Sequence, residues 1–169
     1  NDVLDLSKLE SGKVKYKFEE IDIRDVAEMV KGTLLVEAVK KGITMDMDWP
    51  EMLPRVKGNK ELLKQVFINL LNNAIKFTES GKILIQMRKV GNNIEVEVKD
   101  TGIGISEEEQ KRLFKKFHQV DSSTSRKYSG TGLGLSIVKH IIDDHQGEVR
   151  VLSELGKGTS FIFTVPIAS

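Results

Sequence analysis

The sequence contains no cysteine, only three prolines and few aromatic side chains. The absence of cysteine excludes disulfides, thiolate chemistry and cysteine-ligated zinc. No apolar run approaches the roughly 18 residues that a membrane-spanning helix needs. The formal net charge is only +1, and so balanced a charge argues against a dedicated nucleic-acid surface. We therefore expect no nucleic-acid partner.

The composition that is present is that of an ordinary globular chain, 39% hydrophobic and 30% charged over 169 residues. This length is enough for one domain with a two-layer core. The chain opens at Asn1 rather than Met, so we expect a piece of a longer protein. In residues 1–12 four apolar side chains can share one helix face before Gly12 ends the helix. We expect this segment to be the end of a helix that begins upstream.

Hydrophobic periodicity predicts interleaved helices and strands. Helices are expected over 22–40 and 59–77, after Ser106, and from the glycine-rich run to about His145. Strands are expected within 14–21, over 43–49, at Val56, and in the segments 83–87, 94–98, 148–152 and 159–165. Because the strands pair as hairpins, the pattern predicts an α+β fold with one mixed sheet covered by helices on one face.

A glycine-rich run, G-T-G-L-G-L over 130–135, leads into an apolar-periodic segment. Glycine lets a backbone approach a ligand closely, and the start of a helix offers free N–H groups that suit a phosphate. The spacing is neither that of the dinucleotide fingerprint nor that of the P-loop. The run predicts a phosphate-binding turn, and the alternative is a flexible turn before a helix.

The helix expected over 59–77 carries several amides on one side, among them Asn69 and Asn73, with Lys76 one turn further on. Asparagine is a poor helix former because its amide competes for the backbone. Amide oxygens are hard ligands that suit Mg²⁺, and a lysine can meet a phosphate as a point charge. The pattern predicts a cation and phosphate site, and the alternative is a solvated polar face.

An acidic residue, Asp100, continues the buried register of the strand that runs from Ile94 to Val98. A carboxylate that points inward is costly unless it is hydrogen-bonded. The turn that follows can satisfy it locally. Alternatively, Asp100 accepts the exocyclic amine of adenine, with Ile105 packed on the base and the hydroxyl of Thr159 in the same pocket.

The segment 118–130 is polar and without period, which predicts a loop. Lys116, Arg126 and Lys127 bring positive charge toward the glycine-rich run, and the alternative is an ordinary solvated surface. Loops that become ordered on nucleotide binding are a common gating device.

The three histidines, His118, His140 and His145, give no catalytic signal. His145 falls at the end of a helix, where a partial positive charge is favourable. We expect all three to be structural.

Five segments, taken in order, resemble the motifs of sensor histidine kinases. N-L-L-N-N-A-I-K-F-T (69–78) resembles the N box, D-T-G-I-G-I (100–105) the first glycine box, F-K-K-F (114–117) the F box, G-T-G-L-G-L (130–135) the second glycine box and G-K-G-T-S-F (156–161) the last glycine motif. The spacing fits throughout, and the resemblance covers nearly the whole chain.

The resemblance implies a two-layer α/β sandwich, with a mainly antiparallel mixed sheet of about five strands and about three helices. It implies that residues 13–169 form a catalytic domain that binds Mg-ATP between the N box and a mobile lid at about 101–131. Residues 1–12 would be the end of the dimerisation and phosphoacceptor helix. The family implies a cytoplasmic domain, whether the parent protein is membrane-anchored or soluble.

Carried over to this sequence, the family's roles fall on named residues. Asn73 would ligate Mg²⁺ with Asn69 assisting, Lys76 would touch phosphate, Phe77 would pack near the nucleotide, and Asp100 would read adenine. The candidate catalytic residues are Asn69, Asn73 and Lys76. The other candidate nucleotide-contacting residues are Gly102, Gly104, Ile105, Lys116, Arg126, Lys127, Gly130, Thr131, Gly132, Leu133, Gly134, Leu135 and Thr159.

The parent kinase would move the γ-phosphoryl group of ATP to a histidine on an upstream helix and then to an aspartate of a response regulator. That histidine lies in an H-E-x-x-[TN]-P type motif, which none of the histidines in this chain matches. We therefore expect a chain that binds ATP without its own phosphoacceptor. Its expected partners are the phosphoacceptor helices and the response regulator, and we expect a monomeric fragment from a homodimeric parent.

Three alternatives remain. ATPases of the same superfamily carry a glutamate as general base where this chain has Asn69, and an amide cannot accept that proton, which favours a kinase. The related protein-serine kinases lack the helix expected over 1–12. A nucleotide-dependent interaction module without catalysis is the third.

Overall fold

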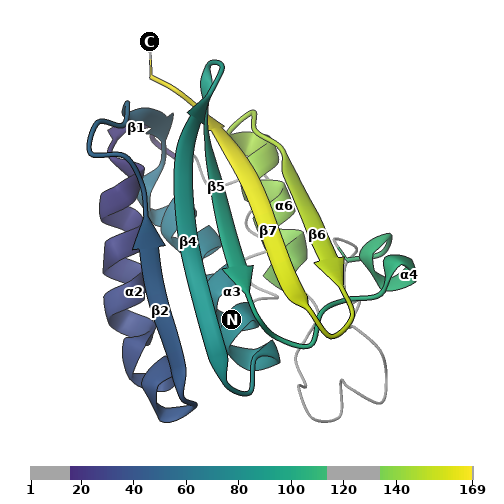
Figure 1. Ribbon diagram of the computed structural model, residues 1–169. Helices are drawn as coiled ribbons and strands as arrows, with labels where there is room; N and C mark the ends of the chain where they lie inside the picture. The colour runs from purple at the N-terminus through teal and green to yellow at the C-terminus, as the bar shows by residue number, and fades with distance from the viewer. Residues whose placement is uncertain (1–15, 114–133, 169) are drawn as a thin grey trace.

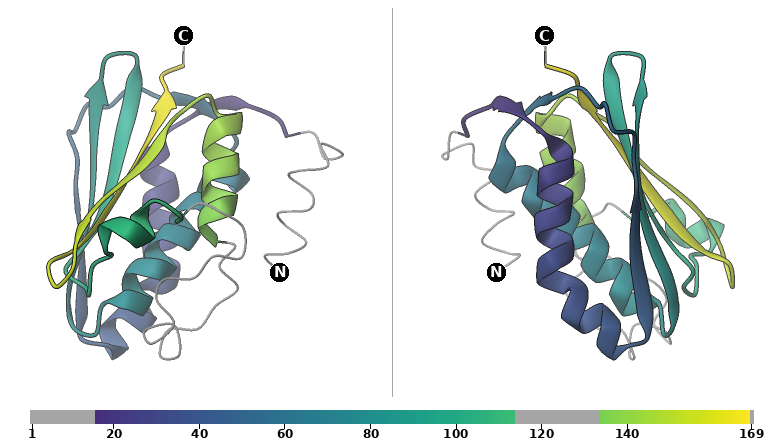
Figure 2. Two further views of the ribbon diagram at one scale, coloured as in Figure 1. Left: turned by 90° about the vertical axis from the view of Figure 1, so that its right-hand side faces the viewer. Right: turned by 60° about the vertical axis from the view of Figure 1, so that its left-hand side comes forward.

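The computed structural model describes residues 16–113 and 134–168. Figure 1 shows two layers, in which three helices cover one face of a five-stranded sheet. The helices are α2 (Ile23–Lys40), α3 (Lys60–Phe77) and α6 (Gly134–Asp144). Both views in Figure 2 place these helices on the same side of the sheet. The predicted α+β sandwich is therefore confirmed.

The sheet has the strand order β2-β4-β5-β7-β6. Its strands are β2 (Ile43–Asp48), β4 (Gly81–Val90), β5 (Asn93–Asp100), β6 (Val149–Glu154) and β7 (Gly158–Pro166). β2 runs parallel to β4, and the other three pairings are antiparallel. The mixed sheet and both predicted hairpins, β4–β5 and β6–β7, are confirmed.

Two short strands differ from the prediction. β1 (Glu19–Ile21) pairs with β3 (Val56–Gly58) in a separate two-stranded sheet. The sequence predicted one sheet and a longer first strand within 14–21. Because each of these strands leads directly into a helix, they pair with each other beside the helix starts instead of extending the large sheet. The helix predicted after Ser106 is a single turn, α4 (Glu107–Gln110).

The core lies between the three helices and the sheet. Ile94, Val96 and Val98 of β5 are fully buried or nearly so, as their alternation predicted. Phe67 of α3 meets Phe163 of β7 edge to face, with 5.5 Å between the ring centroids. This contact fixes α3 against the centre of the sheet.

Both ends of α3 are held by side chains. The side chain of Asn59 accepts a hydrogen bond from the N–H of Leu62 at 2.9 Å, which confirms the predicted N-cap. At the other end the ammonium of Lys41 donates to the carbonyls of Ile75 at 2.6 Å and Lys76 at 3.4 Å. A cation is favourable at the C-terminal end of a helix. The helix that carries the asparagines is therefore anchored at both ends.

His145 joins α6 to the start of α3. Its Nε2 accepts the N–H of Asn59 at 3.1 Å, and its Nδ1 donates to the carbonyl of Ile141 at 2.8 Å. Its ring lies 4.6 Å from that of Phe18. Because Nε2 accepts the N–H of Asn59, it carries no proton, and burial lowers the pKa of His145 in the same sense. The prediction of a favourable positive charge on His145 is therefore wrong, because this helix end is buried and burial disfavours the charged imidazole.

No helix in the described parts of the chain has the length and apolar character to span a bilayer.

Candidate active site

A pocket opens beside the last turns of α3, where the end of β5 meets the start of β7. The empty space between its lining atoms, including the open mouth, is about 370 Å³. It is lined by Asn73, Phe77, Asp100, Gly104, Ile105, Leu113, Leu135, Thr159 and Phe161. The fold thus brings together seven predicted site residues from four separate parts of the sequence.

Asp100 forms the polar end of this pocket and is only 5% exposed. Its Oδ1 accepts the N–H of Gly102 at 2.9 Å and the N–H of Thr159 at 3.2 Å. Oδ2 accepts no hydrogen bond from the residues that the structure describes. Burial raises the pKa of Asp100, and the two N–H groups oppose that rise. The local turn therefore satisfies one oxygen and leaves the other for a ligand.

Apolar side chains form the walls. Ile105 comes from the segment after β5, Leu113 follows α4, and Phe161 lies two residues beyond Thr159 on β7, and all three are buried. Apolar walls with one polar end suit a flat heterocycle that carries a hydrogen-bond donor. Leu113 and Phe161 were missed as site residues. The signal for Phe161 was available, because a strand places residues two apart on the same face.

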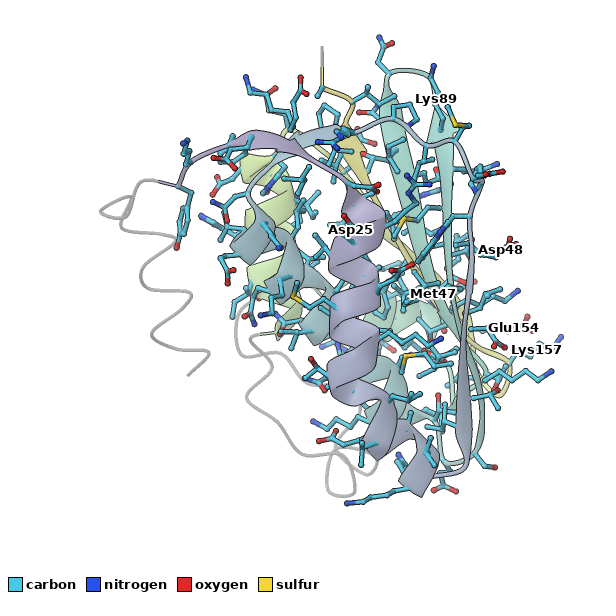
Figure 3. All side chains as sticks on the ribbon, turned by 90° about the vertical axis from the view of Figure 1, so that its left-hand side faces the viewer. Asp25, Met47, Asp48, Lys89, Glu154 and Lys157 are labelled. Atoms are coloured by element: carbon cyan, nitrogen blue, oxygen red, sulfur yellow. The ribbon has the colours of Figure 1, made fainter. Side chains whose placement is uncertain are left out.

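Two glycines fit the pocket for steric reasons. A Cβ on Gly102 would run into the carbonyl of Phe77. Gly104 has φ +76°, and a Cβ there would run into the carbonyl of Glu154. Figure 3 shows the side chain of Glu154 beside Lys157 at the turn between β6 and β7. Only glycine lets the segment after β5 pass between this turn and the end of α3.

The two asparagines on α3 have different surroundings. Asn69 is buried, its Oδ1 accepts from Nε2 of Gln65 at 3.0 Å, and its Nδ2 donates to the carbonyl of Gly134 at 3.1 Å. Asn73 lines the pocket, and its amide has no hydrogen-bond partner among residues 16–113 and 134–168. Asn69 thus ties α3 to the first residue of α6, while Asn73 forms part of the pocket lining.

Lys76 precedes Phe77, a lining residue of the pocket, in the last turn of α3. Its Nζ is 5.9 Å from the centroid of the Phe77 ring. Burial lowers the pKa of Lys76 because it disfavours the charged form. A phosphate near this ammonium would oppose that shift by favouring the charged form.

The donor set fits magnesium. In the described parts of the chain, no three carboxylate, imidazole or thiolate groups gather to hold a metal ion. A Mg²⁺ bound by one protein oxygen together with waters and substrate phosphates needs no such cluster. The amide oxygen of Asn73, a side chain without a hydrogen-bond partner in the described parts of the chain, is a donor of this chemical type.

Ser153 of β6 was missed by the sequence prediction. Its Oγ lies 2.7 Å from the N–H nitrogen of Ile105, 2.8 Å from the carbonyl of Gly158 and 2.8 Å from Oγ1 of Thr159. Gln110 reinforces it by donating to the carbonyl of Ile105 at 2.7 Å. The available signal was a polar residue on the helix-covered face of a strand, the same signal that identified Asp100.

Several predicted residues cannot be placed. The segment 1–12 lies outside the described residues, as do Lys116, Arg126, Lys127, Gly130, Thr131, Gly132 and Leu133. Gly134 and Leu135 open α6, and Leu135 reaches the pocket.

Comparison with known proteins identifies the class to which this fold and pocket belong. The family of histidine kinase-, DNA gyrase B- and HSP90-like ATPases (HATPase_c) matches residues 58–169, and the chain belongs to it. More narrowly, it is a catalytic ATP-binding domain of the histidine kinase type.

Three similar proteins support this narrower assignment. The chain is 39% identical over 171 residues to the signal transduction histidine-protein kinase BarA of Escherichia coli K12. The matched region covers 98% of this chain and 19% of that kinase. The solved catalytic domain of histidine kinase ThkA is 31% identical with a TM-score of 0.78, covering 89% of this chain and 96% of that one. Full-length ShkA in complex with AMPPNP is 31% identical with a TM-score of 0.89, covering 100% of this chain and 35% of that one. The chain thus spans about a fifth of the length of the curated kinase.

Proposed function

We propose that this domain binds Mg-ATP in the pocket beside α3 and delivers the γ-phosphoryl group to a histidine on a helix outside the described residues. The carrying observation is the buried carboxylate of Asp100, which keeps one oxygen for a ligand at the polar end of an apolar pocket. A ligand there must bring a hydrogen-bond donor on a flat apolar body, as adenine does.

At the base end, Asp100 accepts the exocyclic amine of adenine, and Ile105 packs on the ring. Gly102 and Gly104 keep the segment after β5 close enough to form the pocket wall. Thr159 adds a hydroxyl beside the carboxylate.

At the phosphate end, Asn73 gives its amide oxygen to Mg²⁺ and Lys76 meets a phosphate. When bound, magnesium neutralises charge on the phosphate oxygens. Asn69 assists by holding the first residue of α6 in place, and Gly134 and Leu135 lie where that helix begins.

The segment at about 101–131 acts as the lid over the nucleotide in this proposal. Lys116, Arg126 and Lys127 approach the phosphates, and the run from Gly130 to Leu133, with Thr131 and Gly132 between, wraps them.

Transfer joins the γ-phosphorus to a nitrogen of the acceptor imidazole and breaks its bond to the bridging oxygen, which leaves with ADP. Positioning and charge stabilisation supply most of the catalysis in such reactions. Asn69 stands where a hydrolase would need a general base for water, and an amide cannot fill that role. The acceptor belongs to helices of the parent protein, residues 1–12 form the end of one of them, and an aspartate of a response regulator takes the group next.

The test is calorimetric titration of the chain with a non-hydrolysable ATP analogue, with and without Mg²⁺, beside the GTP analogue. Binding that prefers adenine and strengthens with Mg²⁺ supports the proposal. Attachment of the upstream helices should then yield phosphohistidine. Tight binding without phosphohistidine would instead favour a nucleotide-dependent interaction module.

A further inference from the structure

Ser153 lies behind the polar end of the pocket and contacts three groups at once. Its oxygen has one proton to donate and two lone pairs to accept with. The N–H of Ile105 must donate to it, and the carbonyl of Gly158 must accept from it. The single proton of Ser153 is therefore used on Gly158, and one of its lone pairs on Ile105.

The contact between Ser153 and Thr159 then has only one possible direction. Their oxygens are 2.8 Å apart, and Ser153 has no second proton to give. Thr159 must donate its hydroxyl proton to the remaining lone pair of Ser153. If Ser153 donated to Thr159 instead, its lone pairs would face the carbonyl oxygen of Gly158 at 2.8 Å.

The proton of Thr159 is thus directed away from the pocket, and the lone pairs of its hydroxyl are left for a ligand. Asp100 is the residue paired with Thr159 across β5 and β7, so the two side chains lie on the same face of the sheet. Both groups line the pocket. In this state Asp100 and Thr159 can both accept hydrogen bonds from a ligand, and neither can donate one.

We propose that Ser153 is a positioning residue that makes the pocket selective for 6-amino purines, by holding the hydroxyl of Thr159 as an acceptor. An amino group at C6 has two N–H bonds and can satisfy Asp100 and Thr159 together. A 6-oxo purine would place its oxygen against the lone pairs of both groups. This inference rests on the proposed nucleotide site and adds the residue that sets its base preference.

The test compares the dissociation constants of ATP and inosine triphosphate, each with Mg²⁺, by calorimetry. Wild-type chain should prefer ATP. In Ser153→Ala the hydroxyl of Thr159 is released and can donate to the 6-oxo group, so the preference should narrow by roughly two- to tenfold, the worth of one neutral hydrogen bond. Ser153→Thr keeps a hydroxyl and should keep the wild-type ratio.

A matched control is Ser160→Ala, which removes a hydroxyl from the opposite face of β7 and should leave the ratio unchanged. Thr159→Val is a second test of the same inference, because it removes the accepting hydroxyl itself. It should reduce the preference for ATP over inosine triphosphate even if Ser153→Ala does not fold. Thermal unfolding of each variant shows whether it is folded.

The ratio of the two dissociation constants distinguishes a residue that positions Thr159 from one that only stabilises the fold. If Ser153→Ala folds and weakens both nucleotides equally, or Thr159→Val keeps the wild-type ratio, the inference is wrong. Wild-type chain that binds ATP and inosine triphosphate equally also overturns it, while the proposed ATP site stands. Wild-type chain that binds neither nucleotide overturns both proposals.

Discussion

Asp100 illustrates how one residue can be both structural and functional. Its Oδ1 closes the turn after β5 and joins that turn to β7, while its Oδ2 is left at the pocket. The two sequence interpretations, a locally satisfied carboxylate and a ligand acceptor, are therefore compatible, because a carboxylate has two oxygens.

Asp100→Asn should weaken ATP binding by roughly 1–3 kcal/mol, the range for a lost hydrogen bond to a charged group. The substitution keeps the size of the side chain and turns an acceptor into a donor where the amine of adenine is expected. Calorimetry measures the change. Asp46→Asn, on an exposed position of β2, should bind as wild type does. Unchanged affinity in Asp100→Asn would remove this carboxylate from the base site.

Thr78 differs from Asp100 in that its buried hydroxyl makes no hydrogen bond to any described residue. It is fully buried after the last turn of α3, and its Oγ1 has no hydrogen-bond partner among the described residues. Thr78→Val should raise the free energy of unfolding by about 1 kcal/mol, because it removes an unsatisfied polar group and keeps the shape. The extended backbone at this position suits a β-branched residue.

Urea unfolding measures that change, and Thr164→Val gives a matched comparison. The hydroxyl of Thr164 accepts the N–H of Glu148 at 3.0 Å, so the same substitution there should destabilise. A loss of stability in Thr78→Val would show that its hydroxyl has a partner in solution.

At the scale of the element, α3 serves two neighbours at once. Its apolar side packs on the sheet, while Asn69 contacts α6 and Asn73 faces the pocket one turn later. This division follows from the geometry of a helix, where residues four apart lie above one another but reach different neighbours along its axis.

The two asparagines should therefore respond differently to removal. Asn73→Ala should abolish the strengthening of ATP binding by Mg²⁺ with little change in folding stability, because its amide makes no hydrogen bond to the residues that the structure describes. Asn69→Ala should lower the free energy of unfolding by about 1–3 kcal/mol, since it leaves Gln65 and the carbonyl of Gly134 without a partner. Titrations with and without Mg²⁺, together with urea unfolding, measure both effects. An unaltered Mg²⁺ dependence in Asn73→Ala would contradict its role as ligand.

At the scale of the whole molecule, His145 makes stability depend on pH. Its pKa is lowered in the folded state, so the unfolded chain takes up this proton first. The stability that depends on neutral His145 is complete above the unfolded pKa of about 6.5. It falls as the pH drops below that value and levels off beneath the folded pKa. The raised pKa of Asp100 acts with the opposite sign, because that carboxyl takes up its proton first in the folded state.

The urea concentration at the midpoint of unfolding should therefore be lower at pH 5.5 than at pH 7.5. His145→Gln should be less stable at both values and should show a smaller difference between them. An equal pH dependence in His145→Gln and wild type would assign the effect to another group.

The sequence predicted those parts of the fold and site that depend on local periodicity. Alternation in β4 and β5 gave the hairpin and placed Asp100 on its buried face. The pair of β1 and β3 was not predicted, because three-residue strands show no period. The contacts of Ser153 depend on the register between β6 and β7 and on the segment after β5. The contact between Ser153 and Ile105 joins residues 48 positions apart, beyond the reach of any sequence window. The contacts with Gly158 and Thr159 are local and depend on the register of the hairpin.

The direction of β7 has a consequence for how this domain can be joined to others. The strand starts at the pocket, where Thr159 pairs with Asp100, and ends beside Asn93 at the turn of the β4–β5 hairpin (Figure 1). Seven residues of strand separate these two ends, or about 23 Å at 3.3 Å per residue. A module attached after Ile167 would start at the end of the sheet opposite the pocket. A domain joined there would therefore begin at the end of the sheet away from Asp100 and would not start over the pocket.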